Sequence, residues 1–363
     1  MVDDKSVTMT HHLGVDAGGT STRAVVLDSH GRALGYGRSG SGNPISAGPA
    51  VAATSLRAAT AQALAGAGLR GSVISTTAVA MAGGSSVTDD PDVADSIRDA
   101  LVSTGVTAGV SIEKDLLALY FSGTPQPDGY ALVSGTGAAA VRVRGGEVEA
   151  VCDGLGWLLG DDGSGFWIGR EMARAVAADL DGRGPATALT PLLLAATASA
   201  TGQKTEVSLD PGSVEPQHPS SDQNPLLREI VKHVYALRPV QLAQYAPLAF
   251  EAMSAHDAVA ENIVNRAGQA LADTLAAVVI PGLDGPLVVG GSVLVNRQAV
   301  RDIVGGVQPH SPPAPAGEAR AGRPLVIVPD GLVGAAVLAL RNAGLPVDTG
   351  VFDTVTRSVR RLR

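Results

Sequence analysis

Residues 13–37 read LGVDAGGTSTRAVVLDSHGRALGYG, and this stretch decides the fold. It contains three apolar runs separated by residues that favour turns, a pattern that predicts three short strands joined by tight turns. The strands are expected at residues 13–16, 23–28 and 33–37. The turn at residues 17–21 is rich in glycine, so the backbone there can approach a ligand that a side chain would exclude. The stretch therefore predicts a β-meander with an open first turn.

Residues 130–152, YALVSGTGAAAVRVRGGEVEAVC, repeat the same order of strand, glycine-rich turn, strand, turn and strand. In both copies the first turn mixes hydroxyl side chains with glycines. Two such units predict two similar α/β halves that face each other. The alternative is a chance recurrence of meanders in a chain rich in glycine and valine. The matching turns favour the repeat.

The rest of the chain adds helices and strands to both halves. Helices are expected at residues 50–67, 93–103, around 246–278 and at 331–342, and strands at 76–81, 109–113, 286–289 and 325–328. Polar and proline-rich composition predicts loops at residues 202–225 and 308–324. We expect a first domain at residues 1–120 and a second at residues 121–330, with residues 331–363 packing back on the first.

Composition narrows the possible partners. The chain has 363 residues, 45% of them hydrophobic, which is enough for two buried cores. A formal net charge of −8 argues against nucleic acid as a partner, because phosphate neutralisation needs a basic surface. The single cysteine, Cys152, excludes an internal disulfide and an all-cysteine metal site. No apolar run reaches the ~20 residues that span a bilayer, and no signal-peptide core is present. We expect a cytoplasmic protein without a membrane partner.

The turn after Asp16 has the composition of a phosphate-binding loop. Gly18 and Gly19 leave backbone N–H groups open to an anion, and Thr20 and Ser21 add hydroxyl donors. Asp16 can hold Mg²⁺ directly or through water. Alone this turn is a weak signal, because glycine pairs with an aspartate are common in hairpins. It is not a Walker A loop, since no Gly-Lys-Ser/Thr follows.

Two further glycine turns offer related chemistry. They are Gly135-Thr136-Gly137 and Gly290-Gly291-Ser292. The first, from the second half of the chain, could grip the same polyphosphate from the other side of a cleft. The second follows an apolar strand, and its small side chains would admit a flat adenine ring. Its alternative interpretation is an ordinary strand-to-helix connection.

Three aspartates are candidates for contact with an acceptor. Asp115 follows a predicted strand and precedes an apolar helix, where it could act as a general base or as a helix N-cap. The residues alone favour the cap. Asp161 and Asp162 lie in GDDGSG, residues 160–165, before another helix, and could recognise sugar hydroxyls or an amine. Because an apolar segment ends just before Asp161, we expect its carboxylate to be partly buried and to need partners.

Taken together, three blocks resemble the BadF/BadG/BcrA/BcrD ATPase family. They are GVDAGGT at residues 14–20, SGTG at residues 134–137 and GDDGSGFWIGR at residues 160–170. The resemblance runs from about residue 13 to residue 340 and is greatest to the N-acetylglucosamine and glucosamine kinases of the family. It implies an α/β fold of two ribonuclease-H-like domains, the actin-like ATPase and sugar kinase fold, around an interdomain cleft. It also implies ATP and Mg²⁺ as cofactors and a homodimer.

The resemblance assigns roles to individual residues. By this resemblance, Asp115 matches the catalytic base, and Asp16 and Thr20 match the loop that binds Mg²⁺ and phosphate. Thr136 and Gly137 match residues at the junction of phosphate and sugar, and Asn43 and Asp161 match sugar-binding positions. Gly290 and Gly291 match the loop at the nucleotide base. Asp162, next to Asp161, is added to the expected sugar contacts.

One departure from the family bears on the substrate. N-acetylglucosamine kinases of the animal type carry Gly-Gly-Trp-Gly before the acidic loop, whereas this chain has Leu155 in the place of that tryptophan. Free glucosamine carries an ammonium group that Asp161 and Asp162 could pair with. The composition, rich in alanine, glycine, valine and arginine, also resembles proteins of high-GC bacteria, where glucosamine kinases of this family occur.

We therefore expect ATP-dependent phosphorylation of the 6-hydroxyl of glucosamine. N-acetylglucosamine or a broader set of hexoses are the alternative acceptors, and a non-catalytic sugar sensor is the alternative from another class. Dehydratase activators of the same fold hold an iron–sulfur cluster with two cysteines from each subunit, and one cysteine is too few for that. The cysteine-rich zinc motif of repressor-type glucokinases is absent from the sequence.

Overall fold

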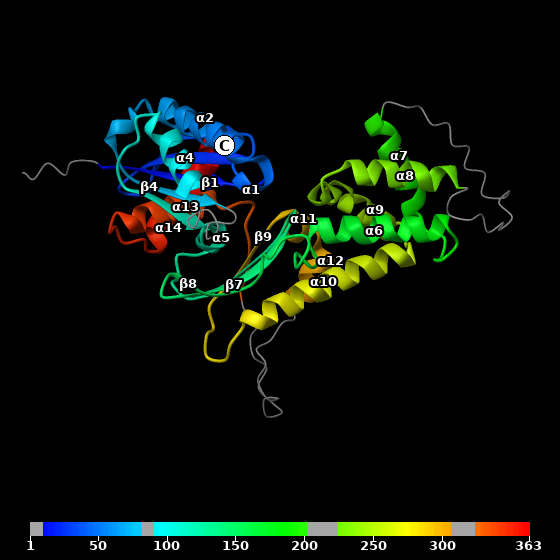
Figure 1. The fold of residues 1–363 in the computed structure, drawn as a ribbon. Helices are drawn as coiled ribbons and strands as arrows, with labels where there is room; N and C mark the ends of the chain where they lie inside the picture. Colours follow the sequence, from blue (N-terminus) through cyan, green and yellow to red (C-terminus); the bar gives the residue numbers. More distant parts are fainter. Residues whose placement is uncertain (1–9, 82–90, 202–223, 306–323) are drawn as a thin grey trace, which may run out of the picture.

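The computed structural model of the chain describes residues 10–81, 91–201, 224–305 and 324–363 (Figure 1). Most of the residues expected in the two loops, 202–223 and 308–323, lie outside these ranges. At the end of the first loop the prediction was wrong. Asn224 accepts hydrogen bonds from two backbone N–H groups and so caps α8 (Pro225–Ala236), which begins one residue later.

The first sheet has the strand order β3-β2-β1-β4-β5. Its strands are β1 (His11–Ala17), β2 (Thr22–Asp28), β3 (Ala33–Ser39), β4 (Ile74–Met81) and β5 (Val110–Lys114). The first three pair antiparallel as the expected meander, and β4 and β5 continue beside β1 in parallel. The carboxyl ends of β1, β4 and β5 therefore meet at one edge, the usual place for a ligand in such sheets.

The second sheet repeats this design with the order β10-β9-β6-β7-β8. Its strands are β6 (Gly129–Ser134), β7 (Ala138–Arg144), β8 (Glu147–Asp153), β9 (Leu287–Gly290) and β10 (Leu325–Ile327). Here β6 takes the place of β1, with two antiparallel strands on one side and two parallel strands on the other. The repeat inferred from the two meanders thus extends to all five strands of each sheet.

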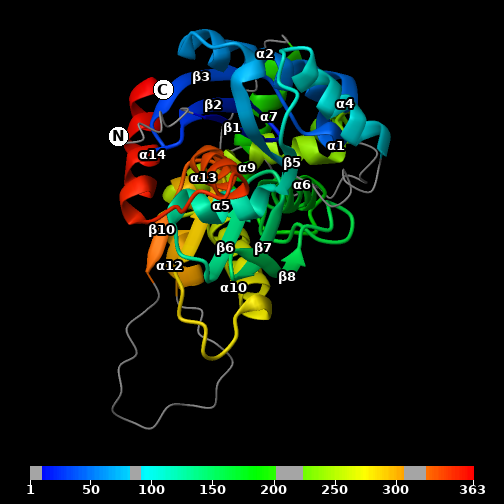
Figure 2. The ribbon, with the colours of Figure 1, turned by 90° about the vertical axis from the view of Figure 1, so that its left-hand side faces the viewer.

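Helices cover the first sheet on both faces (Figures 1 and 2). They are α1 (Pro44–Ala47), α2 (Pro49–Ala67), the 3-10 turn η1 (Gly71–Val73), α4 (Pro91–Val102), α13 (Leu332–Asn342) and α14 (Thr349–Leu362). On one face α2 packs against β2 and β3, and α13 packs against β1 and β4 on the other. The approach of α13 requires Gly14, because a β-carbon there would lie 2.5 Å from the backbone nitrogen of Ala336.

The second sheet carries a larger helical layer. Its elements are α6 (Gly165–Leu180), α7 (Leu189–Thr201), α8, η2 (Pro239–Tyr245), α9 (Ala246–Ser254), α10 (Ala258–Val278), α11 (Ser292–Asn296) and α12 (Gln298–Gly305). The helical region expected around residues 246–278 is broken where His256 adopts a left-handed φ of 61° and Asp257 caps α10. Trp167, Met172 and Val176 form the buried face of α6, as its sequence spacing predicts.

Between the two sheets lie α5 (Asp115–Gly123) and α13, which cross in close contact. A β-carbon at Gly334 would overlap the carbonyl oxygen of Ala118, and the Gly334 N–H donates to Ser122 Oγ at 2.8 Å. Because α5 also packs against β6 and β9, this helix pair joins the two sheets.

The expected class is confirmed: the chain is an α/β protein with two ribonuclease-H-like units. The domain limits at residues 120 and 330 stay a prediction. Within the described ranges, no helix combines the length and the apolar character that crossing a membrane requires.

Candidate active site

Three aspartates from distant parts of the chain meet at the carboxyl edge of the first sheet. Asp16 lies near the end of β1, Asp115 begins α5 directly after β5, and Asp330 precedes Gly331, the N-cap of α13. The Gly331 N–H donates to Asp16 Oδ2 at 3.3 Å. The Asp115 and Asp330 carboxylates both act on the pKa of Asp16, which shows that the three groups are within electrostatic range.

Two arginines partly balance these acids. Arg23 is the cross-strand partner of Asp16, and its guanidinium lies 3.3 Å from the Asp16 carboxylate and 3.4 Å from that of Asp330. Arg363, which follows α14, reaches the other oxygen of Asp330 at 2.7 Å. Burial raises the pKa of Asp16 to about 7, and the Asp330 carboxylate adds to the rise while Arg23 opposes it.

This raised pKa predicts a pH dependence of stability in metal-free buffer. Because the folded protein holds the Asp16 proton more tightly than the unfolded chain, the free energy of unfolding should fall as pH rises from about 4 to about 7. The loss from this one group is up to roughly 4 kcal/mol. Asp16→Asn, which cannot ionise, should flatten this part of the Tm–pH curve measured with EDTA. Parallel curves for the two proteins would contradict the shift.

Asp115 is not the N-cap that the residues alone favoured. Lys114 occupies the N-cap position, and Asp115 is the first residue of the helix, with its Oδ1 accepting the Leu116 N–H at 2.9 Å. Burial raises the pKa of Asp115, and the backbone N–H of Leu116 opposes this rise. A carboxylate with a raised pKa is better matched to accepting a proton near neutral pH. The arrangement therefore suits a general base.

The turn that follows Asp16 has the open backbone expected of an anion site. Gly19 and Thr20 are exposed, and the Gly18 N–H donates to the Ser21 carbonyl at 3.1 Å. The buried Oγ of Ser21 has no hydrogen-bond partner within the described ranges, which is unusual for a buried hydroxyl. Asn43 is brought next to this turn, because the preceding Gly42 N–H donates to the Gly18 carbonyl at 3.0 Å.

The second glycine turn is joined to the start of α6. The N–H groups of Gly165 and Phe166 donate to the carbonyls of Gly135 and Thr136 at 2.7 and 3.2 Å. Ser134 Oγ donates to the Gly163 carbonyl at 3.1 Å. Thr136 itself is exposed at the tip of the turn. Two sequence-predicted blocks, residues 134–137 and residues 160–165, thus form one structural unit.

The third turn meets the same unit. Gly291, with a left-handed φ of 85°, is the N-cap of α11, and a β-carbon there would collide with the Ser134 carbonyl. A β-carbon at Gly290 would collide with a methyl carbon of Leu119, which is one helical turn after Asp115 on α5. Nothing in the described parts of the chain shows a hydrogen bond between the turn at 18–21 and the turn at 134–137, so the two are linked through α5.

Asp161 is buried, as expected, and lies against the second turn. Its Oδ1 accepts the Ala138 N–H at 2.9 Å, and a β-carbon at Gly137 would lie 2.6 Å from that oxygen. Burial raises the pKa of Asp161, the Ala138 N–H opposes the rise, and the Asp153 and Asp162 carboxylates add to it. Asp162 is exposed beside it.

Sequence reasoning missed Asp330, Arg23, Arg363 and Asp153. Asp330 is distant from Asp16 in the sequence: Gly331, the residue after Asp330, donates to Asp16 across a separation of 315 positions. Arg363, at the end of a short basic stretch, follows the last helix residue and is ion-paired at the site. The only local signal was the sequence Pro329-Asp330-Gly331 before a helix of small residues.

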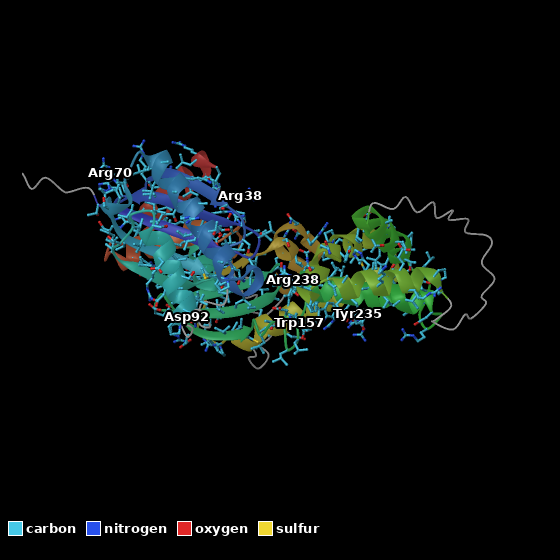
Figure 3. All side chains as sticks on the ribbon, turned by 45° about the horizontal axis from the view of Figure 1, so that its top comes forward. Arg38, Arg70, Asp92, Trp157, Tyr235 and Arg238 are labelled. Carbon is cyan, nitrogen blue, oxygen red and sulfur yellow. The ribbon has the colours of Figure 1, made fainter. Side chains whose placement is uncertain are left out.

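The segment before Asp161 is apolar and exposed. Leu155, Leu158 and Leu159 are 66%, 72% and 76% exposed, and Trp157, labelled in Figure 3, is 40% exposed with its ring edge-on to Phe166.

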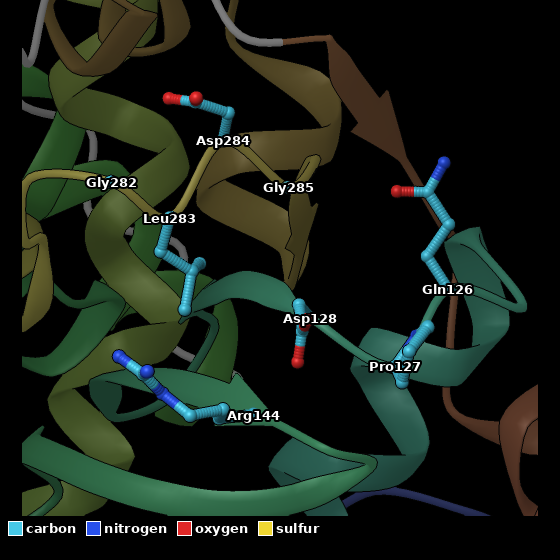
Figure 4. A pocket seen from close by; sticks show the side chains of 8 residues that line it. All are labelled: Gln126, Pro127, Asp128, Arg144, Gly282, Leu283, Asp284 and Gly285. Atoms are coloured by element: carbon cyan, nitrogen blue, oxygen red, sulfur yellow. The ribbon is translucent and has the colours of Figure 1, made fainter.

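A separate surface pocket of about 380 Å³ contains none of the predicted site residues (Figure 4). It is lined by Gln126, Pro127, Asp128, Arg144, Gly282, Leu283, Asp284 and Gly285. These residues lie at the amino ends of β6 and β9, whereas the glycine turns lie at the carboxyl ends of the same strands.

Comparison with known proteins agrees with this arrangement. The N-acetyl-D-glucosamine kinase of Dictyostelium discoideum is 26% identical over 308 residues, which are 80% of this chain and 88% of the relative. A glucosamine kinase of Vibrio cholerae is 27% identical over 196 residues, 50% of this chain and 59% of that protein. A crystal structure of a candidate N-acetylglucosamine kinase from Chromobacterium violaceum has a TM-score of 0.64 at 21% identity, covering 91% of this chain and 99% of that one, and shows the shared fold. The model of the BadF/BadG/BcrA/BcrD ATPase family matches residues 13–339, and the chain belongs to this family.

Proposed function

We propose that the chain transfers the γ-phosphoryl group of ATP to the 6-hydroxyl of glucosamine, giving glucosamine 6-phosphate and ADP. The general activity, ATP-dependent phosphoryl transfer to an amino sugar, is supported by the family and by the names of the two relatives described above. The choice of glucosamine rests on the charge around Asp161.

Three carboxylates gather beside the second glycine turn. Asp153 and Asp162 both act on the pKa of Asp161, and within the described ranges none of the three forms an ion pair. A local excess of negative charge favours a cationic ligand, and the ammonium group of glucosamine can donate charge-assisted hydrogen bonds to it. N-acetylglucosamine and glucose carry no such charge.

The residues on the phosphate side fit MgATP. The exposed residues Gly19 and Thr20 and the unpartnered Oγ of Ser21 supply donors for phosphate oxygens, and Thr136 and Gly137 supply a second set. The described residues contain no cluster of three or more His, Cys, Asp or Glu suited to a metal. Mg²⁺ at a phosphate site needs only one or two carboxylates beside water and phosphate oxygens, so Asp16 with Asp330 is sufficient. There it would neutralise the charge of the phosphates.

The remaining steps belong to the chain's own side chains. Asp115 orients the acceptor hydroxyl and takes its proton as the oxygen attacks phosphorus. Asn43 and Asp161 hold the sugar from the two sides, and Gly290, Gly291 and Ser292 receive the nucleotide base. Closure of the two units about α5 and α13 would exclude water from the transfer.

N-acetylglucosamine is the second candidate acceptor. It is favoured by the name of the Dictyostelium relative, which matches 80% of this chain, and by the exposed apolar side chains at residues 155–159, which could contact an acetyl group. A homodimer and a cytoplasmic location stay predictions.

ADP release measured with MgATP and each of glucosamine, N-acetylglucosamine and glucose tests the proposal. We expect kcat/KM for glucosamine to exceed the other two by at least about tenfold, the value of one charge-assisted hydrogen bond. A higher value for N-acetylglucosamine would establish the alternative acceptor. Sugar binding by calorimetry without any turnover would indicate a sensor.

A further inference from the structure

The carboxylate of Asp153, the last residue of β8, organises the loop that carries Asp161. Its Oδ1 accepts the Asp161 N–H at 2.8 Å, and its Oδ2 accepts the Asp162 N–H at 3.2 Å. Both Asp153 and Asp161 have left-handed backbones, with φ of 65° and 59°. Residues with a β-carbon rarely adopt this conformation, so the hydrogen bonds offset local strain.

This arrangement fixes the direction of the Asp161 carboxylate. Asp153 is the register partner of Ala139 on β7, and the following Gly154 N–H donates to the Ala138 carbonyl at 3.0 Å. Ala138 in turn donates to Asp161 Oδ1 at 2.9 Å. The two ends of the loop are thus anchored to the same place on β7, immediately after the second glycine turn.

One oxygen of Asp161 is left for a ligand. Oδ1 accepts the Ala138 N–H and lies so close to Gly137 that a β-carbon there would clash with it. Oδ2 has no hydrogen-bond partner in the part of the chain that the structure describes. Without Asp153, the N–H groups of Asp161 and Asp162 would lose their acceptor and the strained backbone would be free to relax. The orientation of Oδ2 therefore depends on Asp153.

We propose that Asp153 is a positioning residue for the acceptor sugar. It holds the loop so that Oδ2 of Asp161 meets a hydroxyl or ammonium group of the sugar, and its own charge adds to the negative surroundings that favour a cationic acceptor. This inference rests on the proposed function. Asp153 acts through Asp161, so it should affect the sugar and leave ATP unaffected.

Two substitutions in the full chain separate positioning from stability. Asp153→Asn keeps the shape, tolerates a left-handed backbone and retains one acceptor oxygen. Asp153→Gly relieves the strain and removes both acceptors. We expect KM for glucosamine to rise about tenfold with Asn and further with Gly. KM for ATP should stay within about twofold. The partial rescue by Asn is the signature of a hydrogen-bonding role.

Asp128→Asn is the matched control. The Asp128 carboxylate also accepts a backbone N–H, from Gly145 at 2.7 Å, but at the opposite end of the second sheet. It should leave both KM values unchanged. An unchanged glucosamine KM in both Asp153 variants, or an equal rise in the ATP KM, would overturn the positioning role even if Tm falls. If the unaltered protein phosphorylates no sugar, the proposed function itself fails and this inference fails with it.

Discussion

Replacing Asp115 with asparagine should lower kcat about a thousandfold, while the Kd for glucosamine changes less than about threefold. General-base catalysis by a placed carboxylate contributes a factor of roughly 10²–10⁴, and an amide cannot take the proton. Asparagine has the same shape and its oxygen can still accept the Leu116 N–H that Asp115 accepts at 2.9 Å. Coupled ADP-release kinetics give kcat, and isothermal titration with sugar gives Kd.

Asp284→Asn is the control for this substitution. Asp284 is an exposed carboxylate at the pocket of Figure 4, which contains none of the predicted site residues, and its replacement should leave kcat unchanged. Retention of more than about a tenth of the activity by Asp115→Asn would remove Asp115 from the role of base. A large loss of sugar binding would instead make it a binding residue.

Gly334→Ala should destabilise the protein by about 3 kcal/mol or more and lower activity as well. The new β-carbon would overlap the carbonyl oxygen of Ala118, and backbone atoms cannot yield as a flexible side chain can. The helices α5 and α13 would have to separate, which displaces Asp115 at the start of α5 and Asp330 just before α13. Urea unfolding measures the change in stability, and kcat measures the displacement.

Gly66→Ala provides a matched helical control. Gly66 lies in α2, where a β-carbon would meet its nearest neighbour at an ordinary 3.5 Å. Alanine favours helix more than glycine does, so this variant should be up to about 1 kcal/mol more stable. If both glycine variants lost the same stability, the close crossing of α5 and α13 would not be the cause.

The meanders could be predicted because their signals are local. Alternating apolar runs and glycine turns gave strands at 13–37 and 130–152 that match β1–β3 and β6–β8 to within a few residues. The burial of Asp161 also followed from neighbouring residues, because an apolar segment ends just before it.

The network around Asp16 could not be predicted in the same way. Its partner Asp330 comes from the other end of the chain, and the pairing depends on α13 packing across β1. The residues alone favoured Asp115 as the N-cap, because aspartate is a preferred N-cap residue. In the structure the helix begins one residue earlier, so Lys114 is the N-cap and Asp115 is the first helical residue. Asp153 gave no signal, since its role depends on two left-handed residues eight positions apart in a folded loop.

The position of α13 has a consequence for biosynthesis. This helix covers one face of β1 and β4, yet it is made some three hundred residues after β1, and the Thr76 hydroxyl on β4 donates to the Ala339 carbonyl across 263 positions. During translation α13 therefore cannot cover that face of the first sheet until residues 332–342 have left the ribosome. The N-terminal unit should complete its folding last, and a nascent chain stalled before α13 should be a ready client for chaperones and proteases.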